Sequence, residues 1–416
     1  MTKILVLSSM YPPHHYGGYE LSCRDVVDHW RKRGHEVTVL TSTMRAQNAV
    51  DDPAELDARI LRKLTIFFED GALVRPPLWR QVGIERTNQQ ILADTLEAVQ
   101  PDVVSIWAMG AMSTGLLTPL VRSGIPLVFS VCDDWPTYAY KIDPWMNKWY
   151  RRPRLGRMVE RLMGVPSTLP DLGRAGTFCF ISENNRLRCE QYSPWSFADA
   201  TVVYNGIDLG AFPILDHEPD RSWRWKLVTA GRLDPRKGLE TAIRALALLP
   251  SEAELEVLPS VDDPYRAHLE EVAAEVGVSE RVQYRNVTRT ELRDRYEDAD
   301  VCLFPTEWDE PFGLVPIEAM ARGTPVVATG SGGSGEFLID GMNCVRCSPG
   351  DPQSLADAVS RLEADPSLRR RIAKGGLATA SELNVDRLAE VLELWHIAAA
   401  DHFVNHRPPH RKLQVH

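Results

Sequence analysis

The sequence of 416 residues has no long hydrophobic run and no excess of positive charge. No window approaches the roughly 20 apolar residues that a membrane-spanning helix needs. The first apolar run, Ile4–Leu7, is also too short for the core of a secretory signal. We therefore expect a cytoplasmic protein. The formal net charge of −10 gives no electrostatic reason to expect nucleic acid as a partner.

Cysteine is sparse, and two common nucleotide-binding signatures are missing. The seven scattered cysteines, an odd count, favour reduced thiols in an intracellular protein. Cys344 and Cys347 form one C-x2-C with no second pair nearby, so we expect no zinc site. The loop after the first strand has no G-x-G-x-x-G, which argues against a nicotinamide oxidoreductase. Gly330–Gly335 lacks the Gly-Lys-Ser/Thr of an ATPase P-loop.

The chain does contain enough apolar residues, 44%, for two domains with separate cores. It opens with a predicted strand at Ile4–Ser8, a helix at about Glu20–Arg33 and a second strand at Glu36–Leu40. This order is typical of a doubly wound α/β domain, whose ligands bind at the carboxyl ends of the strands. Gly17 and Gly18 lie in the first such loop. A Gly-Gly pair alone indicates only a turn.

A strand–loop–helix–strand unit dominates the second half of the sequence. We predict strands at Val301–Phe304 and Pro325–Ala328, with a polar loop at Thr306–Gly313 and a helix at about Leu314–Arg322 between them. The start of such a helix presents unpaired N–H groups and a positive dipole end. This unit therefore suits an anionic ligand such as a diphosphate.

Two acids flank the start of this predicted helix. Glu310 lies in the loop and Glu318 in the helix, with seven residues between them. A carboxylate can accept hydrogen bonds from two neighbouring sugar hydroxyls. The pair could hold a ribose–diphosphate–sugar, or the two acids could simply be solvated at a helix start.

A second predicted anion site follows the strand Trp225–Ala230. The turn Gly231–Gly238 carries two spaced cations, Arg232 and Lys237, before a helix at Leu239–Leu249. Fixed cations stabilise the charge that grows on a departing diphosphate. The alternative is solvated surface charge.

Residues 310–321, EPFGLVPIEAMA, resemble the E-x7-E signature of the retaining glycosyltransferases of family 4. The resemblance implies the α/β GT-B fold, in which two Rossmann-like doubly wound domains face each other across a cleft. It assigns the donor-sugar hydroxyls to Glu310, the ribose to Glu318, and the diphosphate to Arg232 and Lys237. The remaining implied donor-binding residues are Gly17, Gly18, Pro311, Phe312, Gly313, Leu314 and Val315.

The resemblance also implies how the chain is divided. We expect residues 1–208 to form an acceptor domain, to which a last helix within 385–416 crosses back, and residues 209–384 to form the donor domain. Many relatives end the strand Pro126–Val131 with a His close to the transferred sugar, but this chain has Cys132. Asp133 or Asp134 could take over part of that contact, and we assign the catalytic role to Asp133. Expected acceptor-binding residues are Glu20, Asp134 and Trp135.

Residues 135–164 are unusually rich in aromatic residues and arginine, and three interpretations stay open. The segment could be a helical lid that packs on the cleft. It could be an acceptor-binding lobe, with rings stacking on sugars and Arg holding anions. It could also be a patch that makes peripheral contact with a membrane carrying a lipid-linked acceptor.

The reaction implied by the resemblance is transfer of a hexose from a nucleotide-diphosphate sugar to an acceptor hydroxyl, with retention of configuration. A front-face mechanism is favoured for the family: Arg232, Lys237 and the helix start stabilise the leaving diphosphate, which helps take the acceptor's proton. We expect no metal and no cofactor, a UDP-sugar or GDP-sugar as donor, and a small-molecule, glycan or lipid-linked acceptor. The sequence does not give the oligomeric state. A non-catalytic nucleotide-sugar sensor or partner subunit is the alternative, favoured only by Cys132.

Overall fold

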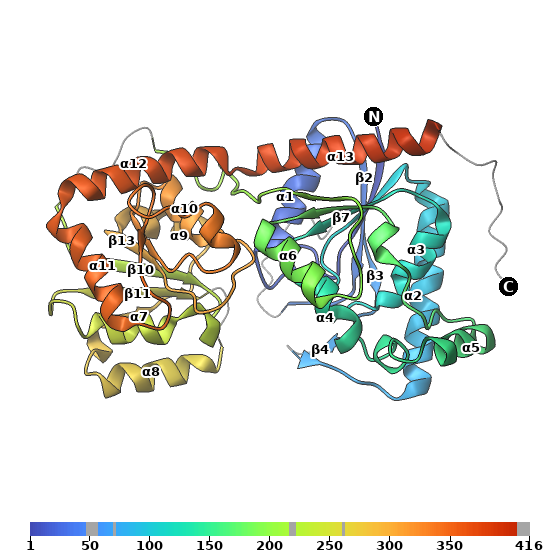
Figure 1. Ribbon diagram of the computed structural model, residues 1–416, viewed down its shortest axis with the longest axis horizontal. Helices are drawn as coiled ribbons and strands as arrows, with labels where there is room; N and C mark the ends of the chain where they lie inside the picture. Colours follow the sequence, from blue (N-terminus) through green and yellow to red (C-terminus); the bar gives the residue numbers. More distant parts are fainter. Residues whose placement is uncertain (47–56, 70–71, 216–221, 260–262, 406–416) are drawn as a thin grey trace.

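The computed structural model describes residues 1–46, 57–69, 72–215, 222–259 and 263–405, and of the last four of these only the backbone. Its chain forms two α/β units side by side (Figure 1). Residues 216–221, early in the expected donor domain, and the end of the expected crossing segment, 406–416, lie outside the described residues.

A parallel sheet of seven strands forms the centre of the first unit, in the order β3-β2-β1-β6-β7-β8-β9. The order reverses between β1 and β6, and ligands of doubly wound folds bind beyond the carboxyl ends of the strands at such a point. The strands are β1 (Lys3–Leu7), β2 (Glu36–Ser42), β3 (Ile60–Leu64), β6 (Val103–Ile106), β7 (Leu127–Val131), β8 (Thr177–Phe180) and β9 (Ala200–Val202). A small antiparallel pair, β4 (Phe68–Glu69) and β5 (Ala72–Leu73), lies apart from this sheet.

The second unit repeats the pattern with six parallel strands, in the order β12-β11-β10-β13-β14-β15. Its order reverses between β10 and β13, so its expected ligand position lies beyond these two strands. The strands are β10 (Lys226–Gly231), β11 (Glu254–Pro259), β12 (Val282–Tyr284), β13 (Val301–Phe304), β14 (Val326–Ala328) and β15 (Val345–Arg346).

Helices cover both faces of each sheet (Figure 1). They bury runs such as Ile4–Leu7 and Val301–Phe304 on both sides, which explains why these strands read as continuous apolar segments. The helices are α1 (Gly18–Lys32), α2 (Leu78–Val99), α3 (Leu117–Ser123), α4 (Trp135–Ile142), α5 (Pro153–Met163), α6 (Glu183–Tyr192), α7 (Leu239–Leu246), α8 (Tyr265–Glu275), α9 (Arg289–Asp298), α10 (Val315–Ala321), α11 (Pro352–Ala364), α12 (Pro366–Glu382) and α13 (Val385–Asn405). Within the described ranges, no helix combines the length and apolar character that crossing a bilayer requires.

The last helix, α13, leaves the second unit and runs along the first (Figure 1). The indole Nε1 of Trp30 on α1 donates to the carbonyl of Ala389, 2.9 Å away. The Trp30 ring also packs on His396, with ring centroids 4.6 Å apart. Glu393 accepts from His35 Nε2 at 2.7 Å, just beyond the end of α1. These contacts fasten the end of the described chain to the first unit.

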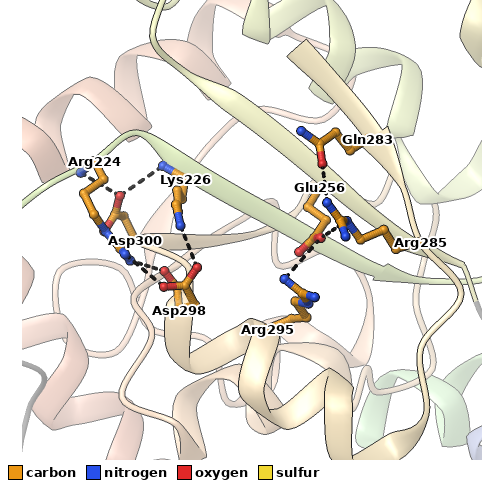
Figure 2. Close-up of polar contacts among 8 residues, drawn as sticks. All are labelled: Arg224, Lys226, Glu256, Gln283, Arg285, Arg295, Asp298 and Asp300. Atoms are coloured by element: carbon orange, nitrogen blue, oxygen red, sulfur yellow. Dashed lines mark hydrogen bonds and ion pairs between the residues drawn. The ribbon is translucent and has the colours of Figure 1, made fainter. Parts of the chain in front are cut away.

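Ion pairs fasten α9 and its flanks to the second sheet, as Figure 2 shows. Asp300 accepts from the backbone N–H of Lys226 at 3.0 Å, and Asp298 at the end of α9 lies 2.7 Å from Lys226 Nζ. Glu256 on β11 pairs with Arg285 at 2.8 Å and with Arg295 of α9 at 3.8 Å. The network fixes the helix that leads into β13 and so supports the loop beyond that strand.

Candidate functional site

The loop between β13 and α10 turns sharply at Gly313. This residue has a φ of +96°, and a Cβ placed there would lie 2.8 Å from the ring of Phe304. Glycine is the residue that tolerates both the positive φ and the close approach. Pro316 in the first turn of α10 then needs no backbone N–H partner. The loop thus delivers its chain directly from a buried strand to the helix start.

Glu310 in this loop is held by two donors from the same unit. It is buried, with 9% of its surface exposed. Lys237 Nζ lies 2.6 Å from Glu310 Oε2, and the indole Nε1 of Trp308 donates to the same oxygen at 3.0 Å. The structure therefore brings Lys237 and Glu310, from separate motifs, into one ion pair. The second oxygen of Glu310 remains as an acceptor for a ligand hydroxyl.

The turn after β10 packs directly against this loop. Gly238 has a φ of +67°, and a Cβ there would lie 1.9 Å from the carbonyl oxygen of Pro305. The Arg236 guanidinium stacks over Trp308, with its Cζ 4.4 Å from the ring centroid. Its Nη2 forms an ion pair with Asp234 Oδ2, 2.7 Å away. Hydrogen bonding to Arg236 lowers the pKa of Asp234 to about 2. The turn and the loop form one connected surface.

Arg232 stands apart from this ion-pair network. It lies just beyond the carboxyl end of β10 and is exposed. In the part of the chain that the structure describes, no hydrogen bond or ion pair engages its side chain. It is therefore a cation available to an anionic ligand at the same edge of the sheet.

Glu318 lies one turn into α10 and is half-buried. The hydroxyl of Tyr296 on α9 donates to its Oε2 at 3.1 Å. Burial raises the pKa of Glu318 above its ordinary value, and the positive charge of Arg289 opposes this effect. Tyr296 thus orients Glu318, and the spacing of the motif gave no sign of this partner.

The glycine loop of the first unit meets the start of α10 across the two units. A Cβ placed on Gly18 would lie 3.0 Å from Cδ1 of Leu314. The N–H of Gly17 donates to Glu20 Oε2 at 3.1 Å. Burial raises the pKa of Glu20 to about 7, against backbone hydrogen bonds that lower it. Glu20 therefore serves as an internal cap of α1.

Other expected donor residues are enclosed by neighbouring side chains. The ring of Phe312 is buried and stacks on Tyr204 with centroids 5.7 Å apart. The carbonyl of Pro311 accepts from Ser182 Oγ at 2.6 Å. Phe312 can therefore meet a ligand only through its backbone. Val315, the first residue of α10, is half-buried.

Asp133 and Asp134 follow β7 and have different surroundings. Asp133 accepts from the hydroxyl of Tyr138 at 2.5 Å, and burial raises its pKa to about 6. Asp134 accepts from the Asn185 amide at 2.9 Å and from Arg188 Nε at 3.0 Å. Asp134 is therefore bonded to side chains of α6, whereas Asp133 accepts from the Tyr138 hydroxyl and, at 3.1 Å, from the backbone N–H of Trp135.

Trp135 and Cys132, on either side of these two acids, both face apolar surroundings. Trp135 is 1% exposed and packs near Phe129, so its ring cannot stack on an acceptor here. The side chain of Trp135 belongs to the core, and a contact between this residue and the acceptor stays a prediction that only its backbone could fulfil. Burial raises the pKa of the Cys132 thiol above its ordinary value. Cys132 lines a small apolar pocket with Trp107 and Leu388.

Several residues at this site went unnoticed in the sequence. Trp308 donates a hydrogen bond to Glu310. Its position two residues before Glu310 in the same loop is the sequence feature that could have indicated this contact. Glu336 accepts from the N–H groups of Glu183 and Asn184 at the start of α6, 3.0 and 2.8 Å away. Arg289 lies 3.6 Å from Asp25 of the first unit. Such contacts between units cannot be read from sequence spacing.

Two family models match the chain. One, described as Glycosyltransferase Family 4, matches residues 16–211, and the other, described as Glycosyl transferases group 1, matches residues 217–378. The glycogen synthase of Mycobacterium tuberculosis is 27% identical over 395 residues, which covers 89% of this chain and 88% of that protein. The D-inositol 3-phosphate glycosyltransferase of Xylanimonas cellulosilytica is 37% identical over 169 residues, which covers 40% of each.

Solved structures resemble the whole chain. The sucrose-phosphate synthase of Thermosynechococcus elongatus gives a TM-score of 0.71 at 21% identity and covers 96% of this chain and 100% of its own. HepE of Anabaena in complex with UDP-glucose gives a TM-score of 0.66 at 21% identity, with coverages of 95% and 100%. At this level of identity the likeness establishes the shared two-domain fold.

Proposed function

This chain is a glycosyltransferase of group 1 with the GT-B fold, and from this premise we propose that it transfers a hexose from a nucleotide-diphosphate sugar to an acceptor hydroxyl. We further propose retention of the anomeric configuration, as in family 4, and no requirement for a metal or cofactor. Residues 1–208, with the helix within 385–416, would take the acceptor, and residues 209–384 the donor. Seven free cysteines support a reducing compartment such as the cytoplasm.

One observation carries the donor proposal: the Lys237–Glu310 pair lies beside the start of α10, at the point where the strand order of the second sheet reverses. A diphosphate between Arg232, Lys237 and the α10 start would meet two cations and unpaired N–H groups. Glu310 would then accept hydrogen bonds from hydroxyls of the donor sugar, and Glu318 would accept hydrogen bonds from hydroxyls of the ribose. Gly18 would contact the phosphates from the first domain. HepE was solved with UDP-glucose, which supports a UDP-sugar as the first donor to test, with a GDP-sugar as the second.

The chemistry we propose rests on fixed charge. Breaking the bond between sugar and diphosphate leaves negative charge on the diphosphate, and Arg232 and Lys237 would stabilise that charge as it develops. The acceptor hydroxyl would attack from the same face, and its proton would pass to the departing phosphate oxygen. Asp133 would position the reacting sugar from the first domain. Closure of the domains would exclude water and so suppress hydrolysis of the donor.

Replacing the cation next to Glu310 tests this proposal. Lys237→Met should lower kcat by about a hundredfold to a thousandfold, the usual effect of losing one group that stabilises developing charge. A screen of UDP-, GDP- and ADP-sugars for turnover would first identify the donor. Lys226→Met is the matched control, because Lys226 pairs with Asp298 at the opposite end of β10. Equal loss in both variants, or none in either, would argue against the proposed role.

Two further readouts separate the finer claims. Nuclear magnetic resonance of the first-formed product should show the same anomeric configuration as the donor, and the inverted product would refute retention. Turnover should survive chelation of divalent metals, and its loss would refute metal independence. A chain that binds the donor but transfers nothing to any acceptor would instead be a sensor.

A further inference from the structure

The helix α5 leaves an apolar stripe without a partner. Leu155, Met158 and Leu162 are 36%, 52% and 77% exposed. Residues three and four positions apart lie on the same face of a helix, so these three side chains form one continuous strip. Isolated exposed apolar residues are ordinary, but a strip of large ones marks an interaction surface.

A basic stripe runs beside the apolar one. Arg154, Arg157 and Arg161 are all exposed and follow the same helical spacing. Across the described ranges, none of their guanidinium groups has a hydrogen bond or an ion pair. The helix contains one acid, Glu160, which is engaged by Arg122 at 2.6 Å and by the Thr168 hydroxyl at 2.9 Å. The outer surface of α5 is therefore positive on a chain whose net charge is −10.

The opposite side of α5 is firmly held. A Cβ at Gly156 would lie 2.2 Å from the carbonyl oxygen of Ser167, so the helix packs directly on backbone. Val159 and Met163 pack against a buried cluster that includes Val82 of α2. Figure 1 shows α5 at the outer end of the first domain, away from the second. Packing therefore fixes which face of the helix points outward.

The start of α2 adds an aromatic anchor to this region. Trp79 is 76% exposed and lies one turn before Val82, the α2 residue that packs with α5. Tryptophan is enriched at the interface between membrane and water. Two other tryptophans of this region pack inward: Trp145 is fully buried, and Trp149 is half-buried in the same cluster. Of the large aromatic and apolar side chains named here, those on the outer surface of α5 and Trp79 are the ones exposed.

We propose that α5 docks this enzyme on an anionic lipid bilayer. The helix lies flat on the membrane, its apolar stripe enters the boundary between headgroups and acyl chains, and its arginines pair with the headgroups. Charge complementarity selects this occupant, because an anionic surface matches the only outward charges of the helix. Clustered unpaired arginines would repel those of a second copy of the same surface.

Docking has a consequence for the acceptor, which, unlike docking itself, rests on the proposed transfer reaction. Along the chain, α4 and the ten-residue segment 143–152 separate α5 from Asp133 and Asp134. An acceptor embedded in the membrane at α5 would lie on the domain that we propose to bind acceptors. Lipid-linked acceptors are the class that this arrangement favours.

Cosedimentation of the full chain with vesicles tests the docking directly. We expect binding to vesicles of phosphatidylcholine mixed with phosphatidylglycerol, weaker binding as salt is added, and little to pure phosphatidylcholine. Replacing Arg154, Arg157 and Arg161 together by Gln should weaken binding on the order of a hundredfold, since each contributes about tenfold or less. The triple variant Leu155→Ser, Met158→Ser, Leu162→Ser should abolish it. Controls are Arg370→Gln and Leu248→Ser, both exposed on the second domain.

Vesicle binding is measured without turnover, so the docking proposal and the proposed transfer reaction can fail independently of each other. All substituted side chains are exposed, so the variants should melt at the temperature of the parent, and hydrolysis or transfer with water-soluble acceptors should be unchanged. No binding to either vesicle, equal binding by the variants, or equal binding to both vesicles would overturn the proposal. So would a dimer of the parent that the serine variant converts to a monomer, because the stripe would then be a protein interface.

Discussion

Buried and half-buried carboxyl groups lie near the place where the two domains meet. Glu20 and Asp133 both have raised pKa values, about 7 and about 6, because burial disfavours their charged forms. The pKa of Glu318 is raised for the same reason. Each group is therefore easier to protonate in the folded protein than in the unfolded chain. The free energy of unfolding should therefore fall as the pH rises toward neutral and these groups lose their protons.

Glu20→Gln tests this effect at one residue. A folded pKa raised to about 7 from an ordinary 4.5 gives stability that is fully present below pH 4.5 and is lost as the pH rises through 7. The parent should therefore lose about 3 kcal/mol relative to the variant between acid and neutral pH. Urea unfolding at several pH values measures this difference. Glu97→Gln, at an exposed position on α2, should show no such trend.

Residue identity alone did not predict the partners within the site. The E-x7-E spacing indicated Glu310 and Glu318, and the turn after β10 indicated Lys237. The ion pair between Lys237 and Glu310 joins residues 73 positions apart, which no local pattern encodes. The burial of the Trp135 ring was equally hidden from local patterns. An aromatic residue beside cleft acids suggests stacking, whereas the fold buries this ring in the core.

At the scale of elements, the loop from β13 to α10 depends on one glycine. Gly313 combines a positive φ with a close contact to Phe304. Gly313→Ala should therefore destabilise the protein by roughly 2–4 kcal/mol, from backbone strain and overpacking together. Donor binding should weaken as well, because the loop carries Glu310. Thermal unfolding and donor titration measure both effects.

Gly341→Ala provides a matched comparison. Gly341 has a φ of +70°, but nothing lies within 4 Å of a Cβ placed there. Backbone strain alone should destabilise this variant by about 1–2 kcal/mol. Equal effects of the two substitutions would mean that the Phe304 contact does not shape the loop.

The elements that sequence patterns predicted are those with strong periodic or apolar signals. The predicted bounds agree within one or two residues with the observed bounds of the three strands that flank the site, β1, β10 and β13. The start of α2 at Leu78 was not expected, because its first turns expose Leu78 and Trp79 and so break the amphipathic pattern. The same exposure made that segment hard to predict and leaves it accessible in the folded protein.

At the scale of the whole molecule, polar contacts hold the two domains together. Arg188 of the first domain links Asp134 to Asp309 of the second, with distances of 3.0 and 2.7 Å. Glu336 of the second domain caps the start of α6 through two backbone N–H groups. A charged acceptor at a helix start adds to the dipole interaction. These contacts define a closed arrangement.

Glu336→Ala should loosen that arrangement. Loss of the charged cap should weaken the contact between domains by about 1–2 kcal/mol, enough to populate open forms. Small-angle X-ray scattering without ligand should then give a larger radius of gyration than for the parent. Glu382→Ala is the control, because Glu382 is exposed and pairs with Arg387 at the start of α13. An unchanged radius in both variants would mean that other contacts determine closure.

The two-domain architecture followed from the alternation of strands and helices, but the apposition of the domains did not. Ser182 and Pro311, which form a buried contact between domains, are 129 positions apart. The approach of Gly18 to Leu314 is equally remote in sequence. The family resemblance predicted that two domains face each other, and the structure shows which residues of the two domains are in contact.

The central claim is that a sugar diphosphate binds between the turn after β10 and the start of α10. A crystal structure of the protein with the donor identified by the turnover screen tests it most directly. The account predicts that the phosphates contact Arg232 and Lys237, that Glu310 accepts from the sugar and that Glu318 accepts from the ribose. Phosphates bound elsewhere, away from Arg232 and Lys237, would contradict it.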